Sequence, residues 1–148
     1  MESLPSCEFD GKKLLLKFEV TFSADPKMVS SVVERTMGVV QEMRCAAGKE
    51  FEVETALREA LVNAVVHGCK NNPDQKVQCC VACDETRGLL IVVRDPGPGF
   101  QPESIPSPIV GERLFESHGR GIYMINQLVD EVSFRRGGTE IHMKIKSE

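Results

Sequence analysis

The sequence has no surplus of basic residues. It holds 18 Lys and Arg against 22 Asp and Glu, a net charge of −4 over 148 residues. A nucleic-acid-binding domain usually carries a basic face, so this balance argues against nucleic acid as a partner. The basic residues are scattered along the chain, and they form no polybasic patch of the kind that binds membrane surfaces.

Long apolar runs are missing as well. No uninterrupted run approaches the roughly 20 apolar residues that span a bilayer, and Met1–Cys7 lacks the features of a signal peptide. We therefore expect a cytoplasmic protein whose six cysteines are thiols in a reducing environment. Cys80 and Cys83 have half of a zinc-site spacing, but on a strand they point to opposite faces, which favours small apolar core residues.

What the sequence does contain is regular periodicity. Residues 12–22 alternate between apolar and polar and predict a half-buried strand. Helical spacing predicts a helix from Pro26 to about Gly48 and a second from about Glu52 to His67, with Gly68 ending it. Strands are expected at 76–83, 88–94, 131–135 and 139–146, and a third helix is expected to begin near Gly121. The pattern predicts one domain over residues 1–148, a mixed sheet with helices on one face.

Glu59 and Asn63 lie four residues apart on the second predicted helix and share one face of it. A carboxylate beside an amide oxygen suits a hard cation such as Mg²⁺, which takes oxygen ligands and keeps several waters. An exposed pair that only stabilises the helix is the competing interpretation.

The segment Arg94-Asp-Pro-Gly-Pro-Gly-Phe100 follows a run that reads as a buried strand. Pro96 favours an extended backbone at Asp95, while Gly97 and Gly99 permit sharp turns and a close approach to a ligand. Asp95 could accept a hydrogen bond from an exocyclic amine such as that of adenine, a bond worth roughly 1.5–3 kcal/mol. A simple turn is the alternative.

The segment Ser117-His-Gly-Arg-Gly-Ile122 stands at the start of the third predicted helix. Glycines at a helix start present free N–H groups and the positive end of the helix dipole to an anion. The preceding segment, about residues 101–118, has three prolines and no sustained period, which is typical of a functional loop. No GxxxxGK[ST] phosphate loop occurs in the chain.

In this order, the three segments resemble the boxes of the GHKL ATPases, the class of gyrase, Hsp90, histidine kinases and MutL. Glu59–Gly68 is similar to the N box, Asp95–Gly99 to the first glycine box and Gly119–Ile122 to the second. Within the class the chain resembles bacterial anti-sigma-factor serine/threonine kinases, over about residues 10–146. The resemblance implies a Bergerat fold of the α+β class, a two-layer α/β sandwich in which helices cover one face of a mixed, mostly antiparallel sheet. This fold would bind ATP and Mg²⁺, with about residues 101–118 as the ATP lid.

The resemblance also implies roles for individual residues. Glu59 would be the general base, Asn63 the magnesium ligand, and Asp95 the acceptor for the adenine amine. The other expected nucleotide-binding residues are Gly97, Gly99, Arg113, Gly119, Arg120, Gly121, Ile122 and Thr139. Thr139 would help hold adenine through water. Arg113, in the lid, is a candidate to touch the γ-phosphate, with a solvated surface arginine as the alternative. His67 could face the nucleotide or simply stabilise the helix end.

By the same resemblance, the protein would be an anti-sigma factor that phosphorylates a STAS-type anti-anti-sigma protein and sequesters a sigma factor as a homodimer. A non-catalytic module that uses ATP only to control partner binding is the alternative, although a base at Glu59 favours the kinase. A histidine-kinase fragment is disfavoured, because the three histidines, His67, His118 and His142, precede Gly, Gly and Met rather than an acid.

Overall fold

The computed structural model describes residues 14–84, 88–97 and 117–146. The elements are β1 (Leu14–Ser23), α1 (Pro26–Glu42), α2 (Glu50–Val62), a π-helical turn (Asn63–Gly68), β2 (Lys76–Asp84), β3 (Gly88–Arg94), α3 (Ser117–Leu128), β4 (Glu131–Arg135), a 3-10 turn (Arg136–Gly138) and β5 (Glu140–Ile145). This order of strand, two helices, two strands, helix and two strands confirms the order expected from the periodicity.

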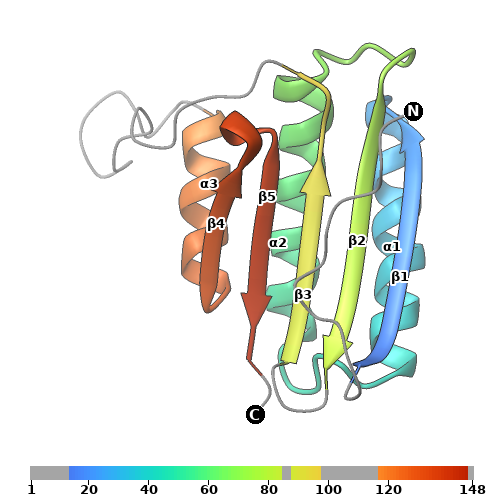
Figure 1. Ribbon diagram of the computed structural model, residues 1–148, viewed down its shortest axis with the longest axis vertical. Helices are drawn as coiled ribbons and strands as arrows, with labels where there is room; N and C mark the ends of the chain where they lie inside the picture. The colour runs from blue at the N-terminus through green and yellow to red at the C-terminus, as the bar shows by residue number, and fades with distance from the viewer. Residues whose placement is uncertain (1–13, 85–87, 98–116, 147–148) are drawn as a thin grey trace.

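The strands form one sheet in the order β1-β2-β3-β5-β4, and all four pairings are antiparallel. The three helices cover one face of this sheet (Figure 1), with α2 packed against both α1 and α3. The predicted α+β, two-layer architecture is confirmed. Because β5 lies between β3 and β4, the loop that follows β3 and the turn that precedes β5 meet at the same end of the sheet.

The core lies between the helices and the inner face of the sheet. Most of the stripe predicted for the first helix is buried there, together with Met37: Val29, Val32, Val33, Thr36 and Val40. Met43, which was also predicted for this stripe, is the C-cap residue and is 41% exposed. The stripe of the second helix is buried beside it: Val53, Ala56, Leu57, Ala60 and Leu61. Alternate residues of the central strands complete the layer, among them Val81, Ile91 and Met143. Burial of these side chains at roughly 25 cal/mol per Å² is the main favourable contribution to folding.

The helix boundaries differ from expectation in two places. The first helix is capped by Asp25, whose carboxylate accepts the Lys27 N–H at 2.9 Å, but it ends at Glu42 rather than near Gly48. The third helix begins at Ser117, four residues earlier than expected, so Gly119 and Gly121 lie within its first turns instead of before them. Periodicity identifies helices better than it identifies their ends.

The cysteines confirm one expectation from the sequence and contradict another. Cys80 and Cys83 do point to opposite faces, and no group of three metal-ligating side chains occurs among the described residues. Cys69 and Cys79 are free thiols. The expectation of six thiols is wrong, however, because a disulfide joins Cys45 to Cys83. Cys45 lies in the connection between α1 and α2 and is buried in the core. The disulfide joins it to Cys83, one residue before the end of β2.

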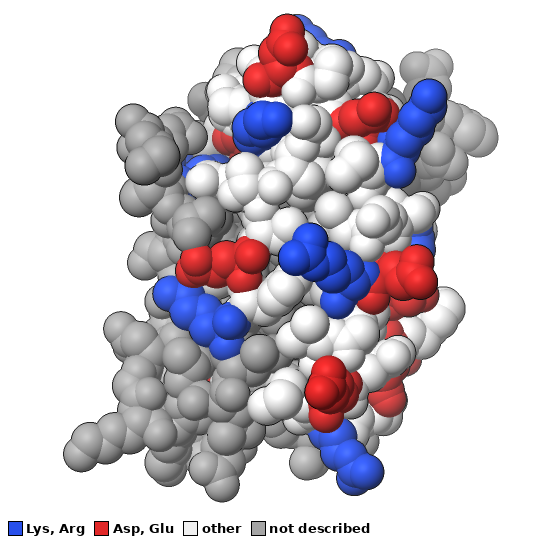
Figure 2. Space-filling view, turned by 90° about the vertical axis from the view of Figure 1, so that its right-hand side faces the viewer, with Lys and Arg blue, Asp and Glu red and all other residues white. Residues whose placement is uncertain are grey.

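Charge on the described surface is mixed, as the scattered basic residues suggested. Figure 2 shows the edge formed by β1 and α1, on which acidic and basic side chains are interspersed. Within the described ranges, no helix has the length and apolar character needed to cross a membrane.

Candidate functional site

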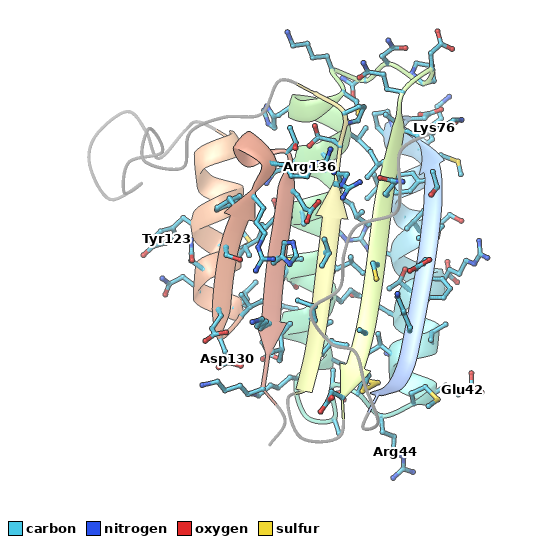
Figure 3. All side chains as sticks on the ribbon, in the orientation of Figure 1. Glu42, Arg44, Lys76, Tyr123, Asp130 and Arg136 are labelled. Atoms are coloured by element: carbon cyan, nitrogen blue, oxygen red, sulfur yellow. A yellow bond between two sulfur atoms is a disulfide. The ribbon has the colours of Figure 1, made fainter. Side chains whose placement is uncertain are left out.

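Three segments that are far apart in the sequence meet where β3 ends. The π-helical turn after α2, the loop Asp95–Gly97 and the turn before β5 are the three. The Asp95 N–H donates to the Thr139 carbonyl oxygen at 2.9 Å, which ties the loop to the turn. Figure 3 shows Arg136 of that turn at the same end of the sheet. Thus two of the predicted nucleotide-binding residues, Asp95 and Thr139, are brought into direct contact.

Asp95 holds a carboxylate that the described residues satisfy only in part. The Gly97 N–H donates to it at 2.8 Å, and among the described side chains no cation forms a salt bridge with it. Burial raises the pKa of Asp95 to about 6, although the Gly97 hydrogen bond acts in the opposite direction. A half-buried carboxylate with spare lone pairs is suited to accept a hydrogen bond from a ligand.

Gly68 and Gly97 form a wall on which no side chain fits. A Cβ added at Gly68 would lie 2.4 Å from the Asp95 Cγ, and one at Gly97 would lie 2.1 Å from the Gly68 carbonyl oxygen. Both contacts are far shorter than van der Waals distance, so glycine is required at both positions. The two glycines let the end of the second helix and the loop after β3 pack backbone to backbone around Asp95.

Glu59 and Asn63 stand in the last turn of α2 and at the start of the π-helical turn, and both are half-buried. The Asn63 N–H donates to the Ala60 and Glu59 carbonyl oxygens, so the two side chains are separated by one helical turn. An amide oxygen and a carboxylate form a donor set that suits Mg²⁺, which keeps several waters and needs few protein ligands. The described residues therefore fit the predicted cation without a dedicated cage.

The π-helical turn was not foreseen. Residues Asn63–Gly68 widen the helix just where the predicted N box ends, and the Cys69 N–H closes the turn on the Ala64 carbonyl oxygen at 2.9 Å. Insertions of this kind are frequent at functional sites. Periodicity did not find it, because six residues are too few to distinguish its repeat from that of an ordinary helix. His67 lies half-buried within it.

Cys69 is a neighbour of the site that sequence reasoning missed. Its side chain is buried, and burial together with the nearby charge of Asp95 raises the pKa of this thiol to about 11. Cys69 is therefore an uncharged neighbour of Asp95. Its position just after the glycine that ends the helix could have signalled it. We call Asp95 and its neighbours the Asp95 cluster: Gly68, Cys69, Gly97 and Thr139.

Thr139 has a hydroxyl that already serves the turn. Its Oγ1 donates to the Arg136 carbonyl oxygen at 2.8 Å. The Thr139 carbonyl oxygen accepts the hydrogen bond from the Asp95 N–H. The turn itself depends on Gly137 and Gly138, whose φ angles of 70° and 91° lie in the left-handed region. Thr139 Oγ1 retains acceptor capacity, which a water-mediated contact would use.

The remaining predicted residues are placed less fully. Gly119, Arg120, Gly121 and Ile122 lie in the first half of α3, for which the backbone alone is described. Gly99, Arg113 and lid residues 101–116 fall outside the described residues. Two hollows of the described surface lie elsewhere, one of about 230 Å³ near the end of α1 and one of about 570 Å³ on the opposite face of the sheet. We assign the site from chemistry and convergence, since neither hollow contains a predicted residue.

Comparison with known proteins agrees with this geometry. The sequence profile of the histidine kinase-like ATPase domain family matches residues 22–145. That range contains the π-helical turn, the loop after β3 and the turn before β5. The match therefore covers every segment that contributes to the Asp95 cluster.

Similar proteins include several named anti-sigma F factors. The one from Heyndrickxia coagulans is 27% identical over 133 residues, which cover 86% of this chain and 90% of that protein. The one from Clostridium acetobutylicum is 29% identical over 135 residues, covering 88% and 93%. The one from Clostridium novyi is 30% identical over 102 residues, covering 64% and 69%.

Proposed function

Because the chain belongs to the histidine kinase-like ATPase domain family, we propose that it is an anti-sigma factor with ATP-dependent serine/threonine kinase activity. It binds ATP with Mg²⁺, phosphorylates a STAS-type anti-anti-sigma protein, and sequesters a sigma factor in the cytoplasm as a homodimer. The anti-sigma F factors that it resembles over most of its length support this assignment.

One observation carries the nucleotide-binding part. Asp95 is half-buried, its pKa is raised to about 6, and it accepts one hydrogen bond from the Gly97 N–H. Gly68 and Gly97 pack backbone to backbone around this carboxylate, where no larger side chain fits. An adenine amine supplies the missing donor, and a charged acceptor makes that bond worth roughly 1.5–3 kcal/mol. Thr139 contributes to the same end of the base through water.

The phosphate end of the nucleotide is assigned to the other segments. Asn63 holds the cation, and the segment Gly119–Ile122, in the first turns of α3, lies beside the phosphates near the positive end of the helix dipole. Gly97 and Gly99 line the loop, and Arg113 contacts the γ-phosphate from the lid. Mg²⁺, when bound, neutralises the charge that develops on the transferring phosphoryl group.

Glu59 acts as the general base. A serine hydroxyl is a poor nucleophile, and a positioned carboxylate accepts its proton while the oxygen attacks the γ-phosphate. Glu59 is half-buried one turn before Asn63, and this spacing supports a base close to the cation that we propose Asn63 holds. A purely regulatory ATP-binding module, the alternative function, has no use for this base.

The experiment is phosphotransfer from labelled ATP to a STAS-type protein, comparing wild type, Glu59→Gln and Glu54→Gln. Glu54 is a half-buried acid of the same helix outside the predicted site, and serves as the matched control. We expect Glu59→Gln to lose at least about 100-fold in transfer rate, a typical contribution of a general base, with Glu54→Gln unchanged. Full activity of Glu59→Gln would remove the catalytic role. Nucleotide binding without transfer by wild type would favour the regulatory module, and acid-labile autophosphorylation would indicate a histidine kinase.

A further inference from the structure

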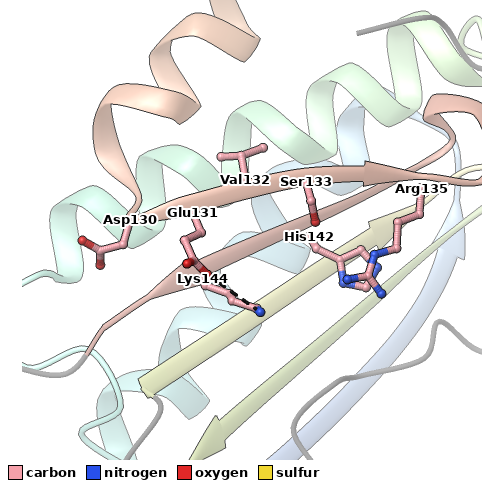
Figure 4. A pocket seen from close by; sticks show the side chains of 7 residues that line it. All are labelled: Asp130, Glu131, Val132, Ser133, Arg135, His142 and Lys144. Carbon is pink, nitrogen blue, oxygen red and sulfur yellow. Dashed lines mark ion pairs between the residues drawn. The ribbon is translucent and has the colours of Figure 1, made fainter.

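The hollow of about 570 Å³ lies over β4 and β5, on the face of the sheet opposite the helices (Figure 1). We call this the outer face. In both strands alternate residues pack into or against the core, among them Val132 and Met143, so the residues between them point outward. Figure 4 shows these outward side chains on one side of the two strands. Those that line the hollow are Glu131, Ser133, Arg135, His142 and Lys144.

His142 lines the hollow and has one ring nitrogen without a partner. Its side chain is 1% exposed, and its Nε2 lies 2.6 Å from a Glu140 oxygen. Burial acts to raise the pKa of Glu140, but hydrogen bonds from His142 and Arg94 hold that pKa below its usual value, so Glu140 is ionised. An ionised carboxylate only accepts, so Nε2 carries the ring proton. Nδ1 is therefore a lone pair in the neutral ring, and it is buried without a hydrogen-bond partner among the described residues.

The unpartnered nitrogen needs an explanation. A buried polar atom left unsatisfied costs about 1–3 kcal/mol, and folded proteins rarely keep one without a functional reason or a bound water or ion. A single water would satisfy Nδ1, but it would not account for the cations beside the ring. Burial is the largest cause of the lowered pKa of His142, and the charges of Arg135 and Lys144 lower it further. Both cations therefore lie close enough to act on the imidazole.

The charges that face His142 come from three neighbouring strands. They are Arg94 of β3, Glu131 and Arg135 of β4, and Glu140 and Lys144 of β5. Three cations against two carboxylates leave one positive charge when His142 is neutral and two when it is protonated. Asp130, which also lines the hollow, is satisfied elsewhere, since it accepts the Lys146 N–H at 2.7 Å and lies 3.8 Å from Lys49 Nζ. The balance therefore favours a ligand with two negative charges.

We propose that the hollow binds a small tetrahedral dianion, either phosphate or the phosphate group of a small metabolite, and that His142 takes up a proton from solvent as the dianion binds. The protonated Nδ1 donates to one phosphate oxygen. Arg135, whose guanidinium has five N–H donors, and Ser133, which the register places opposite His142, donate to others. Three separate donors suit the several oxygens of a phosphate group better than the two of a carboxylate. None of these residues belongs to the Asp95 cluster, so the site is independent of the proposed nucleotide site.

Proton uptake gives the site a definite pH dependence. A dianion that prefers the protonated ring raises the pKa of His142, and by linkage it binds more tightly as pH falls. Because the pKa of His142 is lowered in the folded protein, the gain in affinity appears below about pH 6.5, the usual imidazole value.

The pKa of His142 in the full-length protein is the direct test. The ring-proton NMR signal of His142 is followed against pH in sodium sulfate and in sodium chloride of equal ionic strength. Sulfate is the probe because it remains a dianion throughout the titration range of histidine. The chain has three histidines, so His142→Gln assigns the signal, and His67→Gln with His118→Gln assigns it by exclusion. We expect sulfate to raise the pKa by about one unit, equivalent to about tenfold tighter binding to the protonated ring. An unchanged pKa at tens of millimolar sulfate would overturn the proposal.

The position of the anion is tested by titrating sulfate into Arg135→Gln and Lys17→Gln while the His142 signal is followed. Lys17 is the matched control, because it is an exposed cation of β1 on the outer face, where it pairs with Ala82 beyond the hollow. We expect Arg135→Gln to bind sulfate at least about tenfold more weakly near pH 6, the equivalent of one charged hydrogen bond, with Lys17→Gln unchanged. Both variants remove one positive charge, so equal affinities in the two would refute the hollow as the binding site.

Two further ligands distinguish free phosphate from a phosphorylated metabolite. Inorganic phosphate and glycerol phosphate are titrated against the same His142 signal near pH 6.5. Equal affinities would support the free ion as the ligand, and tighter binding of the ester would mean that the hollow also holds the remainder of a metabolite. Acetate at the same ionic strength is the control for charge. A shift of the His142 pKa in acetate as large as that in sulfate would contradict a site for a dianion.

Discussion

Arg94 and Asp95 are consecutive charged residues at the end of β3, and the protein treats them in opposite ways. Arg94 is buried on the outer face, where its Nε donates to a Glu140 oxygen at 2.8 Å. The other oxygen of Glu140 lies 2.6 Å from His142 Nε2. Asp95 turns to the other side of the strand end and receives only the Gly97 N–H from the described residues. The Arg94 charge is neutralised within the fold, whereas the Asp95 carboxylate keeps acceptor capacity that we propose a ligand uses.

The pKa values of the two acids express this difference. Burial alone would raise the pKa of Glu140, but hydrogen bonds from His142 and Arg94 outweigh it and hold that pKa below its usual value. Burial raises the pKa of Asp95 to about 6, because Gly97 alone does not compensate. An incompletely satisfied carboxylate lowers stability and persists where function requires it. The pair therefore sets a structural charge beside the charge that we propose binds the nucleotide.

The largest effect is expected from the structural charge. Glu140→Gln removes the carboxylate that pairs with buried Arg94 and accepts from His142, which should lower the free energy of unfolding by about 3 kcal/mol. Glu131→Gln is the control, because Glu131 is 58% exposed and its ion pair with Lys144 spans 3.8 Å; we expect at most about 0.5 kcal/mol there. Urea unfolding measures both. Equal losses for the two variants would contradict the assignment of a buried network.

Gly97→Ala should come next. Its Cβ would overlap the Gly68 carbonyl oxygen, so the backbone around Asp95 must shift, at a cost of about 2 kcal/mol in stability. Nucleotide affinity should fall with it, because Asp95 moves. Gly38→Ala is the control, since no atom lies within 4 Å of its added Cβ, and in a helix it should gain about 0.5–1 kcal/mol. Thermal unfolding measures the stability of both variants, and ADP titration measures their nucleotide affinity. An unchanged affinity in Gly97→Ala would count against the close packing of Gly68 and Gly97 around Asp95.

Asp95→Asn should stabilise the free protein. Asparagine keeps the acceptor for the Gly97 N–H and removes a desolvated charge, which is worth about 1–2 kcal/mol near pH 7.5 once solvent screening is allowed for. The raised pKa means that the wild-type penalty appears as pH rises through about 6 and is absent below the usual aspartate range. The two proteins should therefore converge near pH 4. A constant difference at all pH values would mean that the Asp95 charge is not its cause.

The smallest effect concerns His142. Burial lowers the pKa of this imidazole despite its hydrogen bond to Glu140. Near pH 6, His142 is therefore protonated in the unfolded chain but still neutral in the folded chain. The free energy of unfolding consequently decreases as pH falls below about 6.5. His142→Gln should reduce the loss between pH 7 and pH 5 by about 1 kcal/mol. The slope of unfolding free energy against pH tests this, and an unaltered slope would show that His142 does not contribute to it.

The sequence was informative where one residue type has one physical consequence. Alternation predicted the strands, and proline and glycine at 96 and 97 predicted a loop that holds Asp95 close to a ligand. The contacts that depend on three-dimensional pairing were not predictable. The Arg94–Glu140 pair joins residues 46 apart in sequence, and the Cys45–Cys83 bond joins residues 38 apart. The π-helical turn was missed because its six residues are too few to reveal a repeat different from that of an α-helix.

The central claim is that Asp95 accepts the adenine amine of a nucleotide. Isothermal titration calorimetry of wild type and Asp95→Asn with ADP and Mg²⁺ near pH 7.5 tests it directly, with unfolding curves establishing that both are folded. We predict one site per chain in wild type and an affinity lower by about 10–150-fold in Asp95→Asn, the equivalent of a charged hydrogen bond. No heat of binding in wild type, or equal affinities in the two proteins, would contradict the account.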